Sequence, residues 1–267
     1  MHFKKFVFLS ILCAGLCLAF AALPSRERRE LRQLAPDLCQ RTQTLRESYT
    51  LLPDTDFALR VTALQGAQSG KSVYIVAGLH GDEQAAWQAG NLLKETDLAA
   101  GQVWVLSPAN PYGAAHDQRT TRSGRDANRW FGSNTDWDAA VLDRAIAADI
   151  NEKQPDLILD LHEAHENARQ NQDRYDALGN SLVCYSLESI GDTVLDFLQA
   201  TENAPGFSAP FTLYSSPPAG SLNDYAGRVL GISTITVETW RGEELSSRVQ
   251  TQLRTVAFFL RKSQLIA

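Results

Sequence analysis

Short apolar segments alternate with amphipathic ones along most of this chain of 267 residues. The apolar runs have the length of buried strands, and the stretches between them repeat their apolar positions at helical spacing. Strands are predicted at 57–64, 73–77, 103–106, 157–161, 182–185 and 232–237, and helices at 83–95, 136–153, 190–201 and 243–262, with a short one before 232. This order predicts an α/β fold, a three-layer αβα sandwich with a mixed, mainly parallel central sheet.

The segment before the first predicted strand is charged and amphipathic. Its leucines recur at helix-like spacing, which predicts an N-terminal helix over about 25–48, followed by a catalytic core over about 55–267. These leucines are Leu31, Leu34, Leu38 and Leu45. No repeat or linker divides the chain, so 22–267 is expected to form one domain. Two loops, 107–135 and 204–220, are long enough to carry function.

The first residues have the pattern of an export signal. Lys4 and Lys5 precede an uncharged run that ends in small residues around Ala21. We therefore expect a signal peptide at 1–21 and a periplasmic or secreted protein without stable membrane association after cleavage. A retained membrane anchor is the alternative. Cys39 and Cys184 could then form a disulfide, or they could be two separately buried thiols.

The charge of the chain argues against a nucleic-acid-binding protein. The net charge is −6, and removal of the signal would take away two lysines and no acid. No continuous basic stripe is present either.

Three predicted strands run into residues that can bind a metal or move a proton: His80, His162 and Glu238. Parallel strands bring their carboxyl ends to one edge of a sheet, where α/β folds place their sites. Glu83 lies one helical turn after His80, and Gly78 and Gly81 on either side of His80 let the backbone turn sharply, so both could reach one ion. Together with His162 they form a set that suits one Zn²⁺ with a fourth position open for water. Taken alone, His-x-x-Glu would more often be a chance surface pair.

A carboxylate at the end of an apolar strand is costly to bury without a function. Glu238 is therefore predicted to be a general base, and a salt bridge to Arg241 is the alternative. Asp160 could orient a ligand histidine or merely cap its strand. Three further polar residues are interpreted as loop residues at the rim of the site: Glu163, His165 and Glu166.

The motifs follow one another in an order that resembles the zinc carboxypeptidase superfamily. They are His80-x-x-Glu83, Asn110-Pro-x-Gly113, Arg119, Asp126-x-Asn128-Arg129-x-Phe131, His162 and Glu238. The resemblance covers about 73–240. It implies that His80, Glu83 and His162 bind zinc, that Glu238 is the base and that Arg119 stabilises the oxyanion. It also implies that Asn128 and Arg129 bind the carboxylate of the substrate.

The chain departs from the pattern of this superfamily at several positions. Arg125, Ala127 and Trp130 stand where other residue types are usual, so specificity could differ. The family also places a tyrosine over the substrate. Tyr214 and Tyr225 are both available, and we name Tyr225 as the candidate.

Within the superfamily, the length of the chain is similar to that of murein-peptide amidases and of the aspartoacylase and succinylglutamate desuccinylase branch. An export signal favours a metallocarboxypeptidase that acts on short peptides, including cell-wall (murein) peptides. The aspartoacylase branch often has a C-terminal β domain, whereas this sequence ends in a predicted helix. The alternatives are an N-acyl amino acid deacylase and a non-catalytic zinc- or peptide-binding protein.

Overall fold

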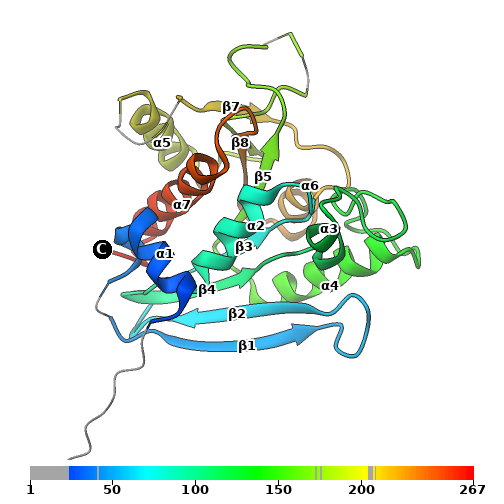
Figure 1. Ribbon diagram of the computed structural model, residues 1–267, viewed down its shortest axis with the longest axis horizontal. Coiled ribbons are helices and arrows are strands. Elements are labelled where there is room, and N and C mark those ends of the chain that lie inside the picture. Colours follow the sequence, from blue (N-terminus) through cyan, green and yellow to red (C-terminus); the bar gives the residue numbers. More distant parts are fainter. Residues whose placement is uncertain (1–23, 41, 172, 175, 204–206, 208) are drawn as a thin grey trace, which may run out of the picture.

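The computed structural model describes residues 24–267 except 41, 172, 175, 204–206 and 208. The predicted signal peptide at 1–21 lies outside the described residues. One mixed sheet runs through the molecule in the strand order β1-β2-β4-β3-β5-β8-β6-β7, with helices on both of its faces (Figure 1).

The bounds of the elements are as follows. The strands are β1 (Leu45–Leu51), β2 (Leu59–Gln65), β3 (Gln68–Ala77), β4 (Ala100–Leu106), β5 (Leu157–Ala164), β6 (Ser181–Cys184), β7 (Thr212–Ser215) and β8 (Thr234–Trp240). The helices are α1 (Arg26–Leu34), η1 (Pro36–Leu38), α2 (Gln84–Leu93), α3 (Pro111–His116), α4 (Asp138–Lys153), α5 (Gly191–Asn203), α6 (Leu222–Tyr225), η2 (Ala226–Leu230) and α7 (Leu245–Lys262).

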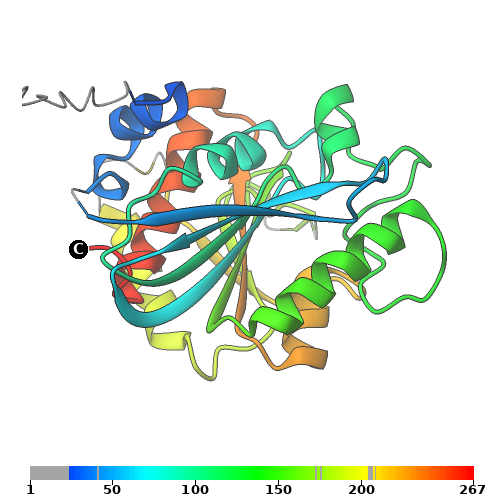
Figure 2. The same ribbon diagram turned by 90° about the horizontal axis from the view of Figure 1, so that it is seen from below.

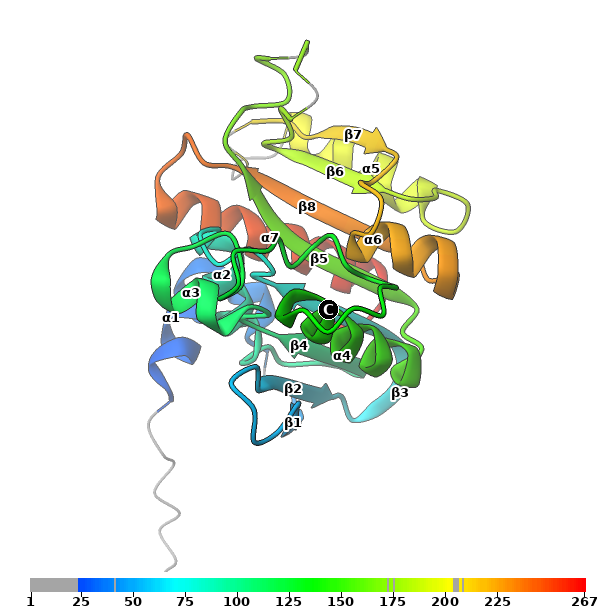
Figure 3. The ribbon, with the colours of Figure 1, turned by 90° about the vertical axis from the view of Figure 1, so that its right-hand side faces the viewer.

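The central strands β4, β3, β5 and β8 are parallel, and antiparallel pairing occurs toward both edges. The predicted mixed, mainly parallel sheet is therefore confirmed. Successive side chains along a strand point alternately into two apolar cores on the two faces of the sheet. In β3, Val73 and Ile75 face one core, and Tyr74 and Val76 face the other. Helices α1, α2, α5 and α7 cover the first face, and α4 and α6 cover the second (Figures 2 and 3).

The predicted helix over about 25–48 is wrong in its second half. Helix α1 ends at Leu34, Pro36 begins the short helix η1, and residues 45–51 form the edge strand β1. Leu31 and Leu38 are buried, but Leu45 is 57% exposed and belongs to no core. The leucine spacing that suggested one helix therefore combines residues from two different elements.

The two long loops contain regular structure that the sequence pattern did not predict. Helix α3 lies within 107–135, and strand β7 lies within 204–220. Strand β7 pairs in parallel with β6 along the whole of both strands and extends the sheet by one strand. Both elements are short, four to six residues long, so they carry little periodicity.

Cys39 and Cys184 are free thiols, so the structure favours two separate cysteines over a disulfide. Burial raises the pKa of the Cys184 thiol to about 12. Within the described part of the chain, no helix combines the length and the apolar character needed to cross a membrane.

A buried carboxylate ties the N-terminal segment to the sheet. Asp97 is 1% exposed and accepts hydrogen bonds from Arg28 of α1 and Arg46 of β1, each with a shortest distance of 2.6 Å. Because these two residues come from different elements, one side chain fixes the position of both.

Asp97→Ala should therefore lower the free energy of unfolding by about 3 kcal/mol, because two guanidinium groups lose a buried partner. Urea denaturation measures this change. Asp196→Ala is the control, since its ion pair with Lys262 is about half exposed on both sides and should be worth less than about 1 kcal/mol. An equal loss of unfolding free energy in both variants would contradict the role of Asp97 in holding α1 and β1.

Candidate metal centre

The turn after β3 places the first two predicted ligands. Gly78 has a φ of +79°, a conformation that glycine adopts without strain, and the chain then turns back into α2. At Gly81 an added Cβ would lie 1.9 Å from the backbone of Gly113, so a side chain does not fit there. His80 lies in this turn, and Glu83 is the N-cap residue of α2. The sequence prediction of a glycine-flanked turn that holds both residues is confirmed.

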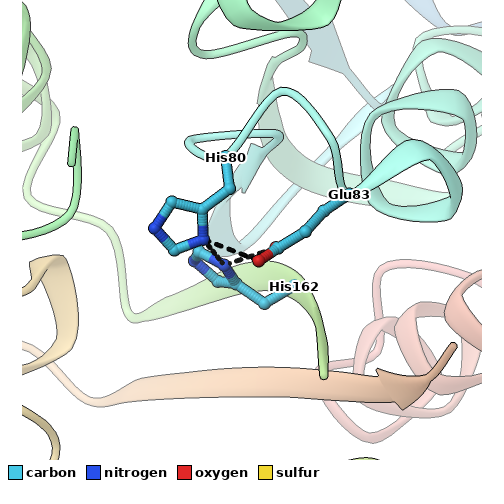
Figure 4. A group of neighbouring side chains, drawn as sticks. All are labelled: His80, Glu83 and His162. Carbon is cyan, nitrogen blue, oxygen red and sulfur yellow. Dashed lines mark hydrogen bonds and ion pairs between the residues drawn. The ribbon is translucent and has the colours of Figure 1, made fainter. Parts of the chain in front are cut away.

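The third ligand comes from the neighbouring strand, and the three side chains meet (Figure 4). Glu83 Oε1 lies 2.7 Å from His80 Nδ1, and Glu83 Oε2 lies 2.7 Å from His162 Nδ1. All three residues are buried, and their ligand atoms lie within 4.8 Å of one another. His80, Glu83 and His162 can therefore hold one metal ion.

The outer nitrogens of both imidazoles face carboxylates. His80 Nε2 lies 2.9 Å from Asp126 Oδ1, and His162 Nε2 lies 3.0 Å from Asp160 Oδ1. An ionised carboxylate only accepts hydrogen bonds, so the hydrogen of His80 belongs on Nε2 and the lone pair of its Nδ1 points to the centre of the cluster. His162 forms an ion pair with Asp160 on its outer side, and its Nδ1 also faces the centre. This arrangement fits a divalent cation with nitrogen and oxygen ligands, such as zinc. Of the two roles considered for Asp160, it favours the orienting one.

The surroundings of the cluster also favour protonation of the two histidines. Burial lowers the pKa of both histidines, but Glu83 with Asp126 for His80, and Asp160 with Glu83 for His162, outweigh burial and raise it. Burial opposes ionisation of Glu83, yet the two histidines lower its pKa well below the usual value. A cation must therefore compete with protons for this site.

Glu238 lies beside the cluster. In the parallel pairing of β5 with β8, Glu238 is the register partner of His162, so the two side chains leave the sheet on the same face. Arg241 pairs instead with Asp82, with 3.0 Å between Nη2 and Oδ2, so the alternative of a salt bridge between Arg241 and Glu238 is wrong. Both strands extend two residues beyond His162 and Glu238, so these residues lie inside their strands and not at the ends.

Burial raises the pKa of the half-buried Glu238 carboxyl, and the negative charge of Glu83 adds to this effect, although both histidines oppose it. The result is a pKa of about 7. A group with such a pKa can accept and release a proton near neutrality.

Arg119 lies next to the ligands, although its side chain is 43% exposed. Its Nη1 is 3.2 Å from Glu83 Oε1, and its Nε and Nη2 donate to Asp126 Oδ2 at 3.2 and 3.0 Å. Asp126 thus joins His80 to Arg119. Asp126 belongs to the Asp-x-Asn-Arg motif, which drew attention to this segment. The sequence alone assigned no function to Asp126.

Asn128 and Arg129 have different environments. Asn128 is buried, with Nδ2 3.3 Å from His162 Nε2 and Oδ1 accepting from the Leu222 amide at 2.8 Å. Arg129 is exposed, and its Nη1 donates to the Asn128 carbonyl at 2.6 Å. Their predicted role in binding a substrate carboxylate remains a prediction. The unusual Arg125 lies over the ring of Trp137 at 4.0 Å.

The two candidate tyrosines are not equivalent. Tyr225 packs against Phe131, with 6.2 Å between ring centroids, directly beside the Asp126 to Phe131 motif. The Tyr214 hydroxyl donates to the Ala177 carbonyl at 3.3 Å. Tyr225 therefore remains the candidate for a contact with substrate.

The prediction that Glu163 is a loop residue at the rim is wrong. Glu163 lies in β5, is 4% exposed and accepts a hydrogen bond from the Ala85 amide at 2.8 Å. No local pattern in the sequence predicts this burial, because the partners of Glu163 come from α2 and α7. His165 is exposed, as expected.

The raised pKa of Glu238 predicts how Glu238→Gln changes the stability of the metal-free protein. Folding favours the protonated acid, so the wild type loses stability relative to Glu238→Gln as the pH rises from 4.5 to about 7. The difference in unfolding free energy should be constant below and above this range. Urea titrations with a chelator measure it. A pH-independent difference between the wild type and Glu238→Gln would refute the raised pKa of Glu238.

Solved structures with the same fold were found, and the three described here are 18–20% identical to this chain. The apo form of the cell shape determinant Csd4 from Helicobacter pylori is 19% identical over 84% of this chain, with a TM-score of 0.66. An mDAP-bound form of Csd4, named as a D,L-carboxypeptidase, is 20% identical over 73% of this chain and 51% of that chain, with a TM-score of 0.65. An aspartoacylase family protein from Mesorhizobium loti is 18% identical over 84% of this chain and 68% of that chain, with a TM-score of 0.61.

The chain spans about half the length of Csd4, since 55% of the apo Csd4 chain is covered. No curated protein matches the chain. The family model of the succinylglutamate desuccinylase/aspartoacylase catalytic domain matches residues 69–263, which include all three metal-ligand candidates and Glu238. The chain therefore belongs to the succinylglutamate desuccinylase/aspartoacylase family, within the wider zinc carboxypeptidase-like superfamily.

Proposed function

We propose that the protein is a zinc-dependent metallocarboxypeptidase that hydrolyses an amide bond next to a free carboxylate in short peptides. The observation that carries this proposal is the register of β5 and β8, which puts Glu238 beside His162 of a buried two-histidine, one-carboxylate cluster. A potential base thus lies next to a set of ligands that suits one divalent cation.

The residues that would hold zinc are His80, Glu83 and His162. When bound, such a cation polarises a carbonyl oxygen and makes water more acidic. The ligands are held ready for it, because Asp126 and Asp160 fix the orientation of both imidazoles.

Glu238 would act as the general base. Its carboxylate accepts a proton from the water that attacks the amide carbon, and it later donates this proton to the leaving nitrogen, so the acid and the amine are released. Its pKa of about 7 suits both steps.

Arg119 would stabilise the negative charge that develops on the carbonyl oxygen. Asp126 accepts hydrogen bonds from two nitrogens of the Arg119 guanidinium, so this positive charge is fixed in place before the substrate binds. Asn128 and Arg129 would bind the free carboxylate of the substrate, with Tyr225 beside them.

Two observations bear on the substrate. The fold is similar to that of Csd4, a D,L-carboxypeptidase that has been solved with mDAP, which favours a short cell-wall (murein) peptide. The family match favours an N-acyl amino acid deacylase as the second candidate. A non-catalytic zinc- or peptide-binding protein is disfavoured, since binding alone requires neither Glu238 nor Arg119 near the cluster.

We also propose export to the periplasm or the medium, followed by cleavage after residue 21. Support comes from Lys4, Lys5 and the uncharged run after them. N-terminal sequencing of the protein made by cells would test this, and a retained first residue would contradict it.

The central test incubates the mature protein with a γ-D-glutamyl-diaminopimelate peptide, ordinary C-terminal peptides and N-acyl amino acids. Removal of the metal by a chelator should abolish turnover, and zinc should restore it. Glu238→Gln should keep the metal but lower kcat at least about 100-fold, because the base is gone. Product release by chromatography and zinc content by elemental analysis give the two readouts.

Glu47→Gln, on the exposed face of β1, is the matched control and should keep full activity. Hydrolysis of only the N-acyl amino acids would establish the second candidate in place of the first. Full turnover by Glu238→Gln, or a protein that binds no metal, would overturn the proposed mechanism.

Arg119→Met should lower kcat by about 100-fold or more, since a preorganised charge near the oxyanion is lost. Arg122→Met is the control from the same loop, because Arg122 pairs with Asp56 on the surface. Steady-state kinetics on the best substrate measure both variants. Equal activities would remove Arg119 from the mechanism.

A further inference from the structure

The C-terminal helix α7 reaches the strand that carries the metal ligand His162. Two of its side chains, Arg248 and Gln252, lie one turn apart and contact consecutive residues of β5. Neither side chain was singled out by the sequence, and neither has a part in the chemistry proposed above.

Arg248 contacts the metal centre through Glu163. Its Nη1 donates to Glu163 Oε1, and Glu163 Oε2 accepts from the Ala85 amide at 2.8 Å. In return, the Glu163 amide donates to Oε2 of the ligand Glu83 at 3.0 Å. The first turn of α2 and the end of β5 are therefore joined by reciprocal hydrogen bonds.

Gln252 contacts the backbone of the ligand itself. Its Nε2 donates to the His162 carbonyl at 2.7 Å and to Thr239 Oγ1 at 3.2 Å. The side chain is fully buried. It thus holds His162 together with the strand β8 that carries Glu238.

We propose that Glu163, Arg248 and Gln252 are positioning residues of the metal centre, which hold Glu83 and His162 in place for the cation. This inference rests on the metal-binding part of the proposed function and does not depend on the substrate. Outer residues that orient metal ligands commonly change the affinity for the metal 10- to 100-fold.

A purely structural role would have a different consequence. Loss of a buried hydrogen bond lowers the stability of the protein with or without metal, but it leaves the affinity for the metal unchanged. The affinity of the folded protein for zinc therefore separates the two roles.

The first test compares Gln252→Met with Gln250→Met. Gln250 lies on the same helix and donates the same kind of hydrogen bond to a backbone carbonyl, at 3.1 Å, but its acceptor is Leu34 of α1. Metal-free protein is titrated with zinc against a chromophoric chelator. Gln252→Met should bind zinc 10- to 100-fold more weakly than the wild type, and Gln250→Met should bind it as the wild type does.

The second test removes both partners of the ion pair between Glu163 and Arg248 at once. The double variant Glu163→Gln/Arg248→Met avoids an unpaired buried charge, so it should fold even where a single change does not. It too should lose 10- to 100-fold in zinc affinity. Arg261→Met, which breaks the exposed ion pair with Asp37 from the same helix, is its control.

The outcomes separate this inference from the proposed function. A wild type that binds no zinc would refute the metal centre itself. A wild type that binds zinc, together with Gln252→Met and double variants of unchanged affinity, would refute the positioning role alone. A shift in the melting temperature of the metal-free variants, without a change in zinc affinity, would likewise assign these residues to stability only.

Discussion

The site depends on one buried carboxylate, that of Glu83. It is 1% exposed, and an ion in such a place is stable only when its oxygens are fully paired. Its oxygen Oε1 contacts His80 and Arg119, and its oxygen Oε2 contacts His162 and accepts a hydrogen bond from the Glu163 amide. The turn after β3, the strand β5 and the long loop before α4 are therefore held together at this one group.

The charges around the cluster are unbalanced in a way that favours a cation. Four carboxylates surround the two imidazoles: Glu83, Asp126, Asp160 and Glu238. Arg119 supplies one fixed positive charge among the groups that contact Glu83. When the imidazoles are neutral, as metal ligands must be, a divalent ion would supply the positive charge that balances these acids. It would also displace the protons that the histidines otherwise hold.

The sheet brings residues that are far apart in the sequence into contact. Glu83 and His162 belong to segments far apart in the sequence, but β3 and β5 are parallel neighbours and β8 follows directly beside β5. Their register decides which side chains share a face, so the pairing of β5 with β8 makes His162 and Glu238 adjacent. Helix α7 then covers this part of the sheet and adds Arg248 and Gln252 behind the ligands.

The amino-acid sequence alone was sufficient to predict the alternating elements, the parallel centre of the sheet and the three metal-ligand candidates. Apolar periodicity and polar residues directly after apolar runs are local signals, and they identified His80, Glu83, His162 and Glu238. The pairing of residues 45–51 as an edge strand depends on contacts with β2 and could not be predicted, since the leucine spacing there also fits a helix.

Tertiary structure also decided which polar groups face one another. Arg241 pairs with Asp82 and not with Glu238, and Glu163 is buried against α7 and not exposed at a rim. Such pairings join residues that are far apart in the chain and depend on strand register and helix packing. A single sequence contains no local pattern for them. The ligands were therefore predictable and Asp160 could be considered as an orienting residue, whereas the contacts of Glu163, Arg248 and Gln252 could not be predicted.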